Sequence, residues 1–291
     1  MNKKIRPLKI SDIANIEQVY INSFNKKKDK IRKPTIWEMY IKKSHDFSLG
    51  IFENNKLIGF SIAHFLDNLV WFGPIGIMKN YQSQGIGSYL LNHQIKKIRQ
   101  HNKDYNLFLE SPELIKNVKF YYKNNFLLHD IVFKILINLK KTHIPKDKKY
   151  KTKVLNPSDI SKIINSFQIN FSNEFLAFIE YHVGIILQIY NNDNQAIALI
   201  QTHSPYIKED NYVTLKYLFY KHFDIKILYK IFNFLKIINK NLVYFSVGGN
   251  KYNILDFLGN ENYKILHYNL LMKHTSNNKT YNNIDFFSMS G

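Results

Sequence analysis

Two glycines stand one residue apart at the start of a predicted helix, in the stretch KNYQSQGIGSYLLNH (79–93). A helix N-terminus leaves its first backbone N–H groups without intrahelical partners and carries the positive end of the helix dipole, which together suit a phosphate. Glycine at positions 85 and 87 lets an anion approach those donors closely, and Ser88 can add a hydroxyl. The stretch therefore predicts a pyrophosphate-binding turn, with an ordinary tight turn as the alternative.

Two common phosphate motifs do not fit this stretch. The dinucleotide fingerprint G-x-G-x-x-G requires a third glycine where Leu90 stands. The P-loop pattern requires a Gly-Lys-Ser/Thr sequence after the turn, and none follows. The turn must therefore belong to another class of phosphate site.

The turn lies within a regular alternation of strand and helix signals that fills the first half of the chain. Alternating or continuous apolar runs predict strands at 4–8, 47–52, 57–64, 69–78, 105–110 and 127–139. Helical spacing and capping residues predict helices from residue 11 and at 36–42, 88–100 and 112–123. The glycine turn then connects the strand that ends at 78 to the helix at 88–100.

The second half of the chain repeats the order of the first. Residues 153–167 echo 5–20, residues 186–203 echo 48–64, and residues 241–247 echo 106–112. A basic, proline-interrupted stretch separates the two copies. We therefore expect two α/β units, at 1–142 and 153–291, joined by a linker at 143–152.

The glycine stretch resembles motif A of the GNAT superfamily of N-acetyltransferases. That motif reads Q/R-x-x-G-x-G/A, matched here by Gln82, Gly85 and Gly87. The preceding strand GPIGIMKNY is similar to the central sheet of the family, and FYYKNNF (120–126) is similar to its terminal F-Y-x-x-x-G-F segment. The resemblance extends over most of residues 4–135.

The resemblance implies a fold of α/β (α+β) class, in which each unit is a mixed, mostly antiparallel sheet flanked by helices. It implies acetyl-coenzyme A as acyl donor and no metal. It places the pantetheine arm along the main chain of Ile75 and Ile77, and it gives the Ile75 N–H an oxyanion-type role. It assigns the pyrophosphate to Gln82, Ser83, Gln84, Gly85, Ile86, Gly87 and Ser88.

Tyr121 falls where the family commonly places a general acid that protonates the departing thiolate. A phenol suits a thiolate leaving group when it is close to the sulfur. The neighbouring Tyr122 is a competing candidate, and both tyrosines also fit a purely packing role.

The general base is less directly indicated. Many family members carry a carboxylate on the strand before the glycines, and Trp71 occupies that position here. Glu110, at the end of the following strand, is our leading substitute, acting through water, while Asp67 and His64 are lesser candidates. The alternative is that Glu110 caps the helix predicted from Pro112.

Two further departures from the family pattern concern details of the site. Asn125 stands where the family has glycine, and Leu114 stands where it frequently has asparagine. They affect the expected cofactor contacts but not the class of protein.

In the second copy the functional residues are missing. Gln82–Gly87 align with Ile225–Lys230, which contains no glycine, and Tyr121 aligns near Phe257. The arrangement resembles tandem GNAT proteins in which one half is catalytic and the other shapes the substrate cleft. We expect the second half to be a degenerate, structural copy.

Composition narrows the chemistry further. The chain has no cysteine, which excludes a cysteinyl intermediate and favours direct attack by the acceptor on the donor. The net charge of +19 suits an anionic cofactor better than nucleic acid, since no arginine-rich helix is present. With no membrane-spanning apolar run and no secretory signal, we expect a cytoplasmic location.

These observations predict an N-acetyltransferase that acts on the primary amine of a small molecule. Two alternatives remain open. The Trp71 substitution allows a non-catalytic, coenzyme A-binding regulatory or scaffold protein, and the acceptor can instead be a protein or peptide.

Overall fold

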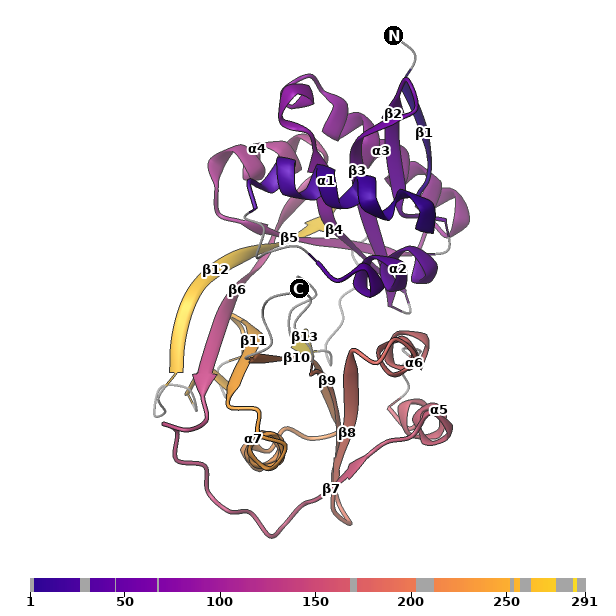
Figure 1. The fold of residues 1–291 in the computed structure, drawn as a ribbon. Helices are drawn as coiled ribbons and strands as arrows, with labels where there is room; N and C mark the ends of the chain where they lie inside the picture. The colour runs from indigo at the N-terminus through magenta and orange to yellow at the C-terminus, as the bar shows by residue number, and fades with distance from the viewer. Residues whose placement is uncertain are drawn as a thin grey trace.

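The computed structural model describes residues 3–26, 32–44, 46–66, 68–167, 172–202, 212–251, 254–256, 263–275 and 285–286. In this part of the chain, strands from both halves form one 13-stranded, mixed but mostly antiparallel sheet, with helices packed on its faces (Figure 1). The expected α/β class and sheet type are therefore confirmed. None of the described helices is long and apolar enough to cross a membrane.

The first half contains all the predicted elements, with ends that differ by a few residues. They are β1 (Lys3–Pro7), α1 (Ile13–Phe24), α2 (Pro34–Lys43), β2 (Leu49–Glu53), β3 (Lys56–Leu66), β4 (Leu69–Ile77), α3 (Ile86–His101), β5 (Asn106–Pro112), α4 (Ile115–Lys123) and β6 (Phe126–Asn138). The helix predicted from Pro112 begins at Ile115, because β5 continues through that proline.

The second half repeats this order of elements. They are β7 (Lys151–Val154), α5 (Pro157–Asn165), α6 (Ser172–Glu180), β8 (Gly184–Tyr190), β9 (Gln195–Gln201), β10 (Tyr212–Tyr220), α7 (Ile225–Ile237), β11 (Leu242–Gly248), β12 (Tyr263–His274) and the short β13 (Asp285–Phe286). Helix α7 begins where the sequence repeat places the counterpart of the glycine turn.

The two halves exchange their last long strands. The sheet order is β1-β2-β3-β4-β5-β12-β6-β11-β10-β9-β8-β7, so β12 of the second half lies between β5 and β6 of the first. β6 in turn pairs with β11 from Val132 to Asn138. Figure 1 shows β6 and β12 running side by side from one half into the other. Each half therefore completes its sheet with a strand of the other.

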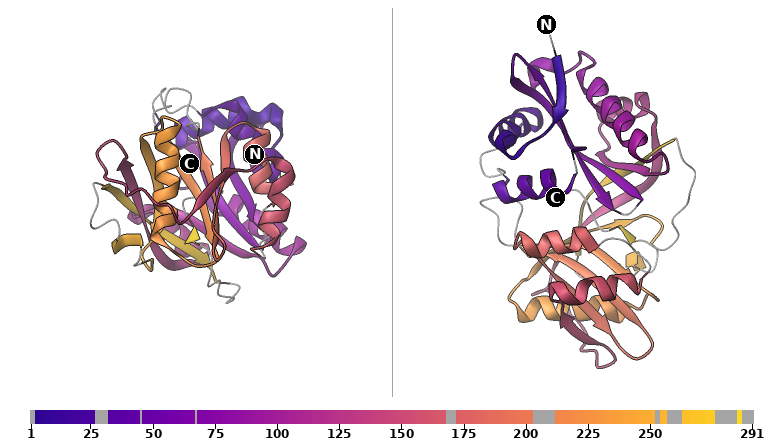
Figure 2. Two further views of the ribbon diagram at one scale, coloured as in Figure 1. Left: turned by 90° about the horizontal axis from the view of Figure 1, so that it is seen from below. Right: turned by 90° about the vertical axis from the view of Figure 1, so that its right-hand side faces the viewer.

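Helices cover both faces of the first half of the sheet. Helices α1 and α2 pack on one face and α3 on the opposite face (Figure 2). The core under α1 and α2 is continuous with that of the second half, because Trp37 and Phe60 belong to the same buried cluster as Phe175 and Tyr217. A separate cluster, which includes Leu91, lies under α3 and α4.

The segment between the halves is more than a polar tether. Ile144 and Tyr150 are buried and pack in the core that α7 covers. β7 begins at Lys151, within the stretch expected as linker. The many lysines concealed these apolar side chains, which are spaced too irregularly to resemble a helix or a strand.

Candidate active site

Strands β4 and β5 separate at the centre of the first half. They pair in parallel only from Leu69 to Phe72 on β4 and from Asn106 to Leu109 on β5. Beyond Phe72, β4 continues through Gly73-Pro74, where its pairing with β3 is also irregular. A proline cannot donate to a ladder, so it suits the point at which a strand leaves its neighbour.

The separation leaves one edge of β4 open. Met78 N–H donates to Ile58 O at 2.9 Å, so the backbone groups of Met78 and, by alternation, Gly76 face β3. The backbone groups of Ile75 and Ile77 therefore face away from β3, and no described strand pairs with them there. In agreement, Gln82 Nε2 donates to Ile77 O at 2.8 Å. This edge could accept an extended ligand, and the cofactor contacts of Ile75 and Ile77 stay a prediction.

The glycine turn follows directly at the end of β4. A short 3-10 turn (Lys79–Tyr81) leads into Gln82, Ser83 and Gln84, which are exposed. Gly85 precedes α3 with a φ of +77° and nothing within 4 Å of the position that a Cβ would take. Its need for glycine is therefore conformational, and the space beside it is open.

The start of α3 offers backbone donors. No described side chain caps its first turn, so the N–H groups of Ile86, Gly87 and Ser88 have no intrahelical partner. Ser88 Oγ accepts a hydrogen bond from Asn124 Nδ2 at 3.0 Å. That hydroxyl keeps its own proton for a second partner. The seven positions 82–88 thus form one turn, exposed at 82–85, with donors at its helical end.

Gly87 has a different role from Gly85. A Cβ on Gly87 would lie 3.2 Å from Phe120 Cε2 and 3.6 Å from Ile77 Cγ1. The first of these contacts is tight and the second is an ordinary van der Waals contact, so glycine here permits close packing of α3 against Phe120 of α4. The two glycines of the motif therefore serve two separate demands.

Tyr121 lies on α4, partly buried in the cluster that includes Leu91. Its ring contacts Phe120 and Phe126, with centroids 4.9 and 6.2 Å away. Burial raises the pKa of Tyr121 to about 12. The phenol therefore stays protonated at neutral pH, as a general acid must. Tyr122 is exposed.

Glu110 is the first residue of β5 beyond its pairing with β4. Its side chain is buried, forms an ion pair with Lys134 Nζ and accepts a hydrogen bond from Asn269 Nδ2. It does not cap α4, which begins at Ile115 without a described side-chain cap. Burial lowers the pKa of Lys134, and the Glu110 carboxylate opposes that change.

Glu110 and Tyr121 border the gap between β4 and β5 from opposite faces of the sheet. Leu109 belongs to the cluster that holds Tyr121, and the neighbouring Phe108 belongs to the cluster of α1 and α2. Because side chains alternate along a strand, Glu110 lies on the same face as Phe108. An acid and a base on opposite faces suit a reaction in which the nucleophile enters on one side and the leaving group departs on the other.

The lesser base candidates lie nearby or outside the described residues. His64 on β3 lies opposite Trp71, and its Nε2 lies 2.9 Å from Gly73 O. A carbonyl only accepts, so Nε2 carries the proton. Burial, opposed by that hydrogen bond, lowers the pKa of His64 to about 4. Trp71 stacks on Phe108, and Asp67 lies outside the described residues.

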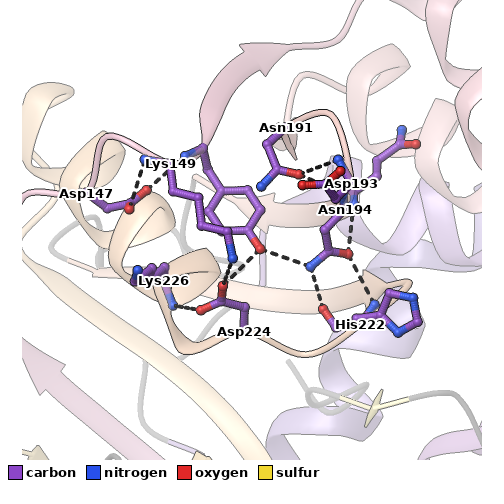
Figure 3. A network of polar contacts seen from close by, with 10 residues as sticks. Asp147, Lys149, Asn191, Asp193, Asn194, His222, Asp224 and Lys226 are labelled. Carbon is purple, nitrogen blue, oxygen red and sulfur yellow. Dashed lines mark hydrogen bonds and ion pairs between the residues drawn. The ribbon is translucent and has the colours of Figure 1, made fainter.

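The counterpart of the glycine turn in the second half is occupied by a side chain. Asp224 caps α7, where its Oδ1 accepts from Lys226 N–H at 3.0 Å. Its Oδ2 accepts from Lys149 Nζ at 2.9 Å and from Tyr150 Oη at 3.0 Å, in the network that Figure 3 shows. The Asp224 carboxylate thus accepts from the N-terminal backbone of α7, whereas no described side chain caps the corresponding end of α3. The predicted counterpart of Tyr121, Phe257, lies outside the described residues.

Lys134 and Asn269 were missed from the sequence as residues of this site. Lys134 carried a signal, since a lysine inside the apolar run FKILIN of β6 requires a charged or polar partner. Asn269 carried none, because 159 residues separate it from Glu110. Only the exchange of β12 brings these two side chains together.

The residues present fit a coenzyme A thioester. The turn at 82–88 would hold a diphosphate, and the open edge of β4 would hold the extended pantetheine arm. Bound there, the thioester would supply an activated acyl group beside Glu110 and Tyr121.

Comparison with known proteins agrees with this geometry. Residues 12–126 match the model of the Acetyltransferase (GNAT) family. No curated protein matches the sequence.

Solved structures share the fold over nearly the whole chain. A putative acetyltransferase from Pyrococcus horikoshii superposes with a TM-score of 0.70 at 15% identity, over 98% of this chain and 92% of that one. A GCN5-related glucosamine N-acetyltransferase region of a fungal β-N-acetylglucosaminidase gives 0.69 at 15% identity, over 94% of this chain and 38% of that one. A tandem GNAT protein from the clavulanic acid biosynthesis pathway superposes with a TM-score of 0.64 at 9% identity. The match covers 96% of this chain and 100% of that one.

Residues 12–126 of this chain therefore match the GNAT acetyltransferase family, and the chain as a whole shares the fold of a tandem GNAT protein.

Proposed function

We propose that this protein transfers the acetyl group of acetyl-coenzyme A to a primary amine of a small molecule, by direct attack within a ternary complex. One observation carries the proposal: the exposed turn before α3 lies next to the unpaired edge of β4 at Ile75 and Ile77. These two features supply donors for a diphosphate and a track for the pantetheine arm at one place.

In this proposal the first half, 1–142, is catalytic and the second half, 153–291, shapes the acceptor side. Tyr121 acts as general acid toward the leaving thiolate, and Glu110 receives the proton of the acceptor amine. Their positions on opposite faces of the sheet support these roles. The Ile75 N–H polarises the thioester carbonyl from the open edge of β4.

Two observations favour a small acceptor. The face that carries Glu110 continues into the buried cluster shared by both halves, where a folded protein has little access. The glucosamine N-acetyltransferase region, which shares the fold over most of this chain, acts on a small amine according to its name. We therefore place the acceptor between the halves.

The donor site is tested by substituting Gly85. Asp at this position would place a negative charge beside the diphosphate, and we expect acetyl-coenzyme A affinity to fall about 100-fold or more. Asn is the matched control, because it has the same size, carries no charge and tolerates a positive φ. Its loss should be about tenfold or less. Isothermal titration calorimetry measures both, and equal affinity in Gly85→Asp and the wild type would refute the donor site.

Turnover is tested with glucosamine, spermidine, lysine and kanamycin as acceptors. Because the chain has no cysteine, a thiol reagent detects only the released coenzyme A. We expect at least one amine to accelerate thiol release. Tight acetyl-coenzyme A binding without acceleration by any of the four would favour the binding-only alternative.

A further inference from the structure

A row of polar side chains crosses the centre of the sheet on four neighbouring strands. Glu110 of β5, Asn269 of β12, Lys134 of β6 and Ser246 of β11 follow one another in this order. Asn269 Nδ2 donates to Glu110, Lys134 Nζ pairs with Glu110, and the same Nζ donates to Ser246 Oγ at 2.8 Å. Two of these residues come from each half of the chain.

Strand register places the row on one face. Glu110 lies opposite Leu271, two residues from Asn269, and Asn269 lies opposite Val132, two residues from Lys134. Residues directly opposite, or two apart on one strand, share a face. That face is the one on which Phe108 and Trp71 stack, on the side where the proposed acceptor enters.

Asn269 has a fixed orientation and an unused acceptor. A carboxylate only accepts, so the group that faces Glu110 must be the amide NH₂. The carbonyl Oδ1 therefore points away from that bond. It is buried and accepts no hydrogen bond from any described residue, although Asn269 as a whole is only 8% exposed. A buried acceptor in this state requires a donor that the described residues do not supply.

We propose that Glu110 and Asn269 form the subsite for the acceptor amine, with Lys134 as a positioning residue. This rests on the function proposed above. The Asn269 carbonyl accepts one N–H of the amine, which directs the nitrogen lone pair toward the acyl carbon. As the nitrogen–carbon bond forms and the carbon–sulfur bond breaks, the amine proton passes to Glu110 and the thiolate takes the proton of Tyr121.

Lys134 explains how a buried carboxylate can act as the base. A carboxylate is costly to bury unless charged or hydrogen-bonding partners surround it. Lys134 Nζ forms an ion pair with Glu110 Oε1, and the Asn269 amide donates to the same oxygen, so both side chains hold the carboxylate in place. Since β12 delivers Asn269, the second half contributes a residue that touches the substrate.

The decisive variant is Asn269→Leu, assayed with whichever of the four named amines the wild type acetylates fastest. We expect kcat/KM for the amine to fall about 10- to 100-fold, mainly through KM, because one hydrogen bond to the nitrogen is lost. Acetyl-coenzyme A affinity should stay within twofold, which also shows that the variant folds. Ser246→Ala is the matched control: it touches Lys134 but not Glu110, and its KM should match the wild type.

Lys134 is tested with Lys134→Met and the conservative Lys134→Arg. We expect kcat to fall at least tenfold in the first and to recover partly in the second, because only a cation restores the ion pair that positions Glu110. The double variant Glu110→Gln/Lys134→Met leaves no unpaired charge and should fold but remain slow.

The outcomes separate the two proposals. If the wild type acetylates an amine and Asn269→Leu keeps its KM and kcat within twofold, the acceptor subsite is wrong while the proposed function stands. If Ser246→Ala raises KM as much as Asn269→Leu, the row is structural and the subsite is refuted. If the wild type acetylates none of the four amines, the proposed function fails and this inference fails with it.

Discussion

Positive φ angles at two positions illustrate how single residues meet the demands of this fold. Gly85 has a φ of +77° and Asn125 a φ of +62°. Asparagine is one of the few side chains that adopts this conformation at low cost. The replacement of the family's glycine by Asn125 is therefore compatible with the turn between α4 and β6.

We expect Tyr121→Phe to lower kcat by about 10²- to 10⁴-fold, the usual contribution of a general acid, with acetyl-coenzyme A affinity unchanged. Because the pKa of Tyr121 is about 12, the wild type should show no loss of activity from this group below about pH 11. Steady-state kinetics and calorimetry measure both effects. The exposed Tyr122 provides the control. If Tyr122→Phe lowers kcat more than Tyr121→Phe does, Tyr122 is the general acid and Tyr121 is not.

His64 makes stability depend on pH. Its pKa is about 4 in the folded protein and 6.5 in the unfolded chain, so the unfolded chain binds more protons between these values. Its contribution to the free energy of unfolding is fully present above pH 6.5 and declines as the pH falls toward 4. From pH 6.5 to 5 the loss is about 2 kcal/mol.

Urea titrations at pH 7 and pH 5 measure this loss, which His64→Gln should reduce. The exposed His93 is the control, and His93→Gln should leave the pH dependence unchanged. His274, whose pKa burial also lowers to about 4, accounts for a remaining part. An unchanged pH dependence in His64→Gln would contradict the assignment.

At the scale of single residues, the sequence allowed us to name those candidate site residues that belong to short local motifs. The turn at 82–88 and the candidates Tyr121 and Glu110 could be named because local patterns point to them, although the roles of these residues remain predictions. Lys134 and Asn269 could not be named as site residues from the sequence. Their contacts with Glu110 depend on the pairing of strands that are far apart in the chain.

At the scale of elements, α3 and α7 differ at their N-termini. The first turn of α3 has no described side-chain cap, whereas Asp224 caps α7 and also binds Lys149 and Tyr150 (Figure 3). A helix whose donors already face an internal carboxylate has little attraction for a second anion. We therefore expect one acetyl-coenzyme A per chain.

Asp224→Ala should lower the free energy of unfolding by about 1 to 2 kcal/mol, the usual cost of losing a helix cap. It should leave the stoichiometry of acetyl-coenzyme A binding at one. Urea denaturation and calorimetry test the two statements. Asp193→Ala changes an exposed member of the same network and should have little effect. A second binding site in the wild type would contradict the assignment of α7.

Helices and strands of the first half were predictable because hydrophobic periodicity marks them directly. The buried Leu90, Leu91, Ile95 and Ile98 recur on one face of α3. The segment after β6 was harder to interpret, because Ile144 and Tyr150 are single anchors within a lysine-rich stretch. Isolated apolar residues produce no periodic signal.

At the scale of the molecule, the exchange of β6 and β12 joins the halves into one folding unit. Without the second half, β5 would expose an edge next to Glu110, and β6 would lose both of its neighbours, β12 and β11. The internal repeat could be seen in the sequence, but not the exchange. β6 and β12 are equivalent strands of the two copies, and either one can supply apolar side chains next to β5. Hydrophobic periodicity therefore does not show which of them pairs with β5.

We expect residues 1–142, produced alone, to fail to fold or to aggregate through the exposed strand edges. Mixing them with residues 143–291 during refolding should restore a 1:1 complex that binds acetyl-coenzyme A. Circular dichroism, size-exclusion chromatography and calorimetry follow these steps. A fragment 1–142 that is monomeric and binds with the affinity of the whole chain would contradict the expectation.

The position of β12 in the sequence also determines when the sheet can be completed during synthesis. β6 ends at Asn138 and β12 begins at Tyr263, so the ribosome must add the intervening residues before the central gap can be filled. At typical elongation rates this takes roughly 6 to 25 s. For that interval the nascent chain presents an unfinished sheet, which makes it a natural client for chaperones that shield strand edges.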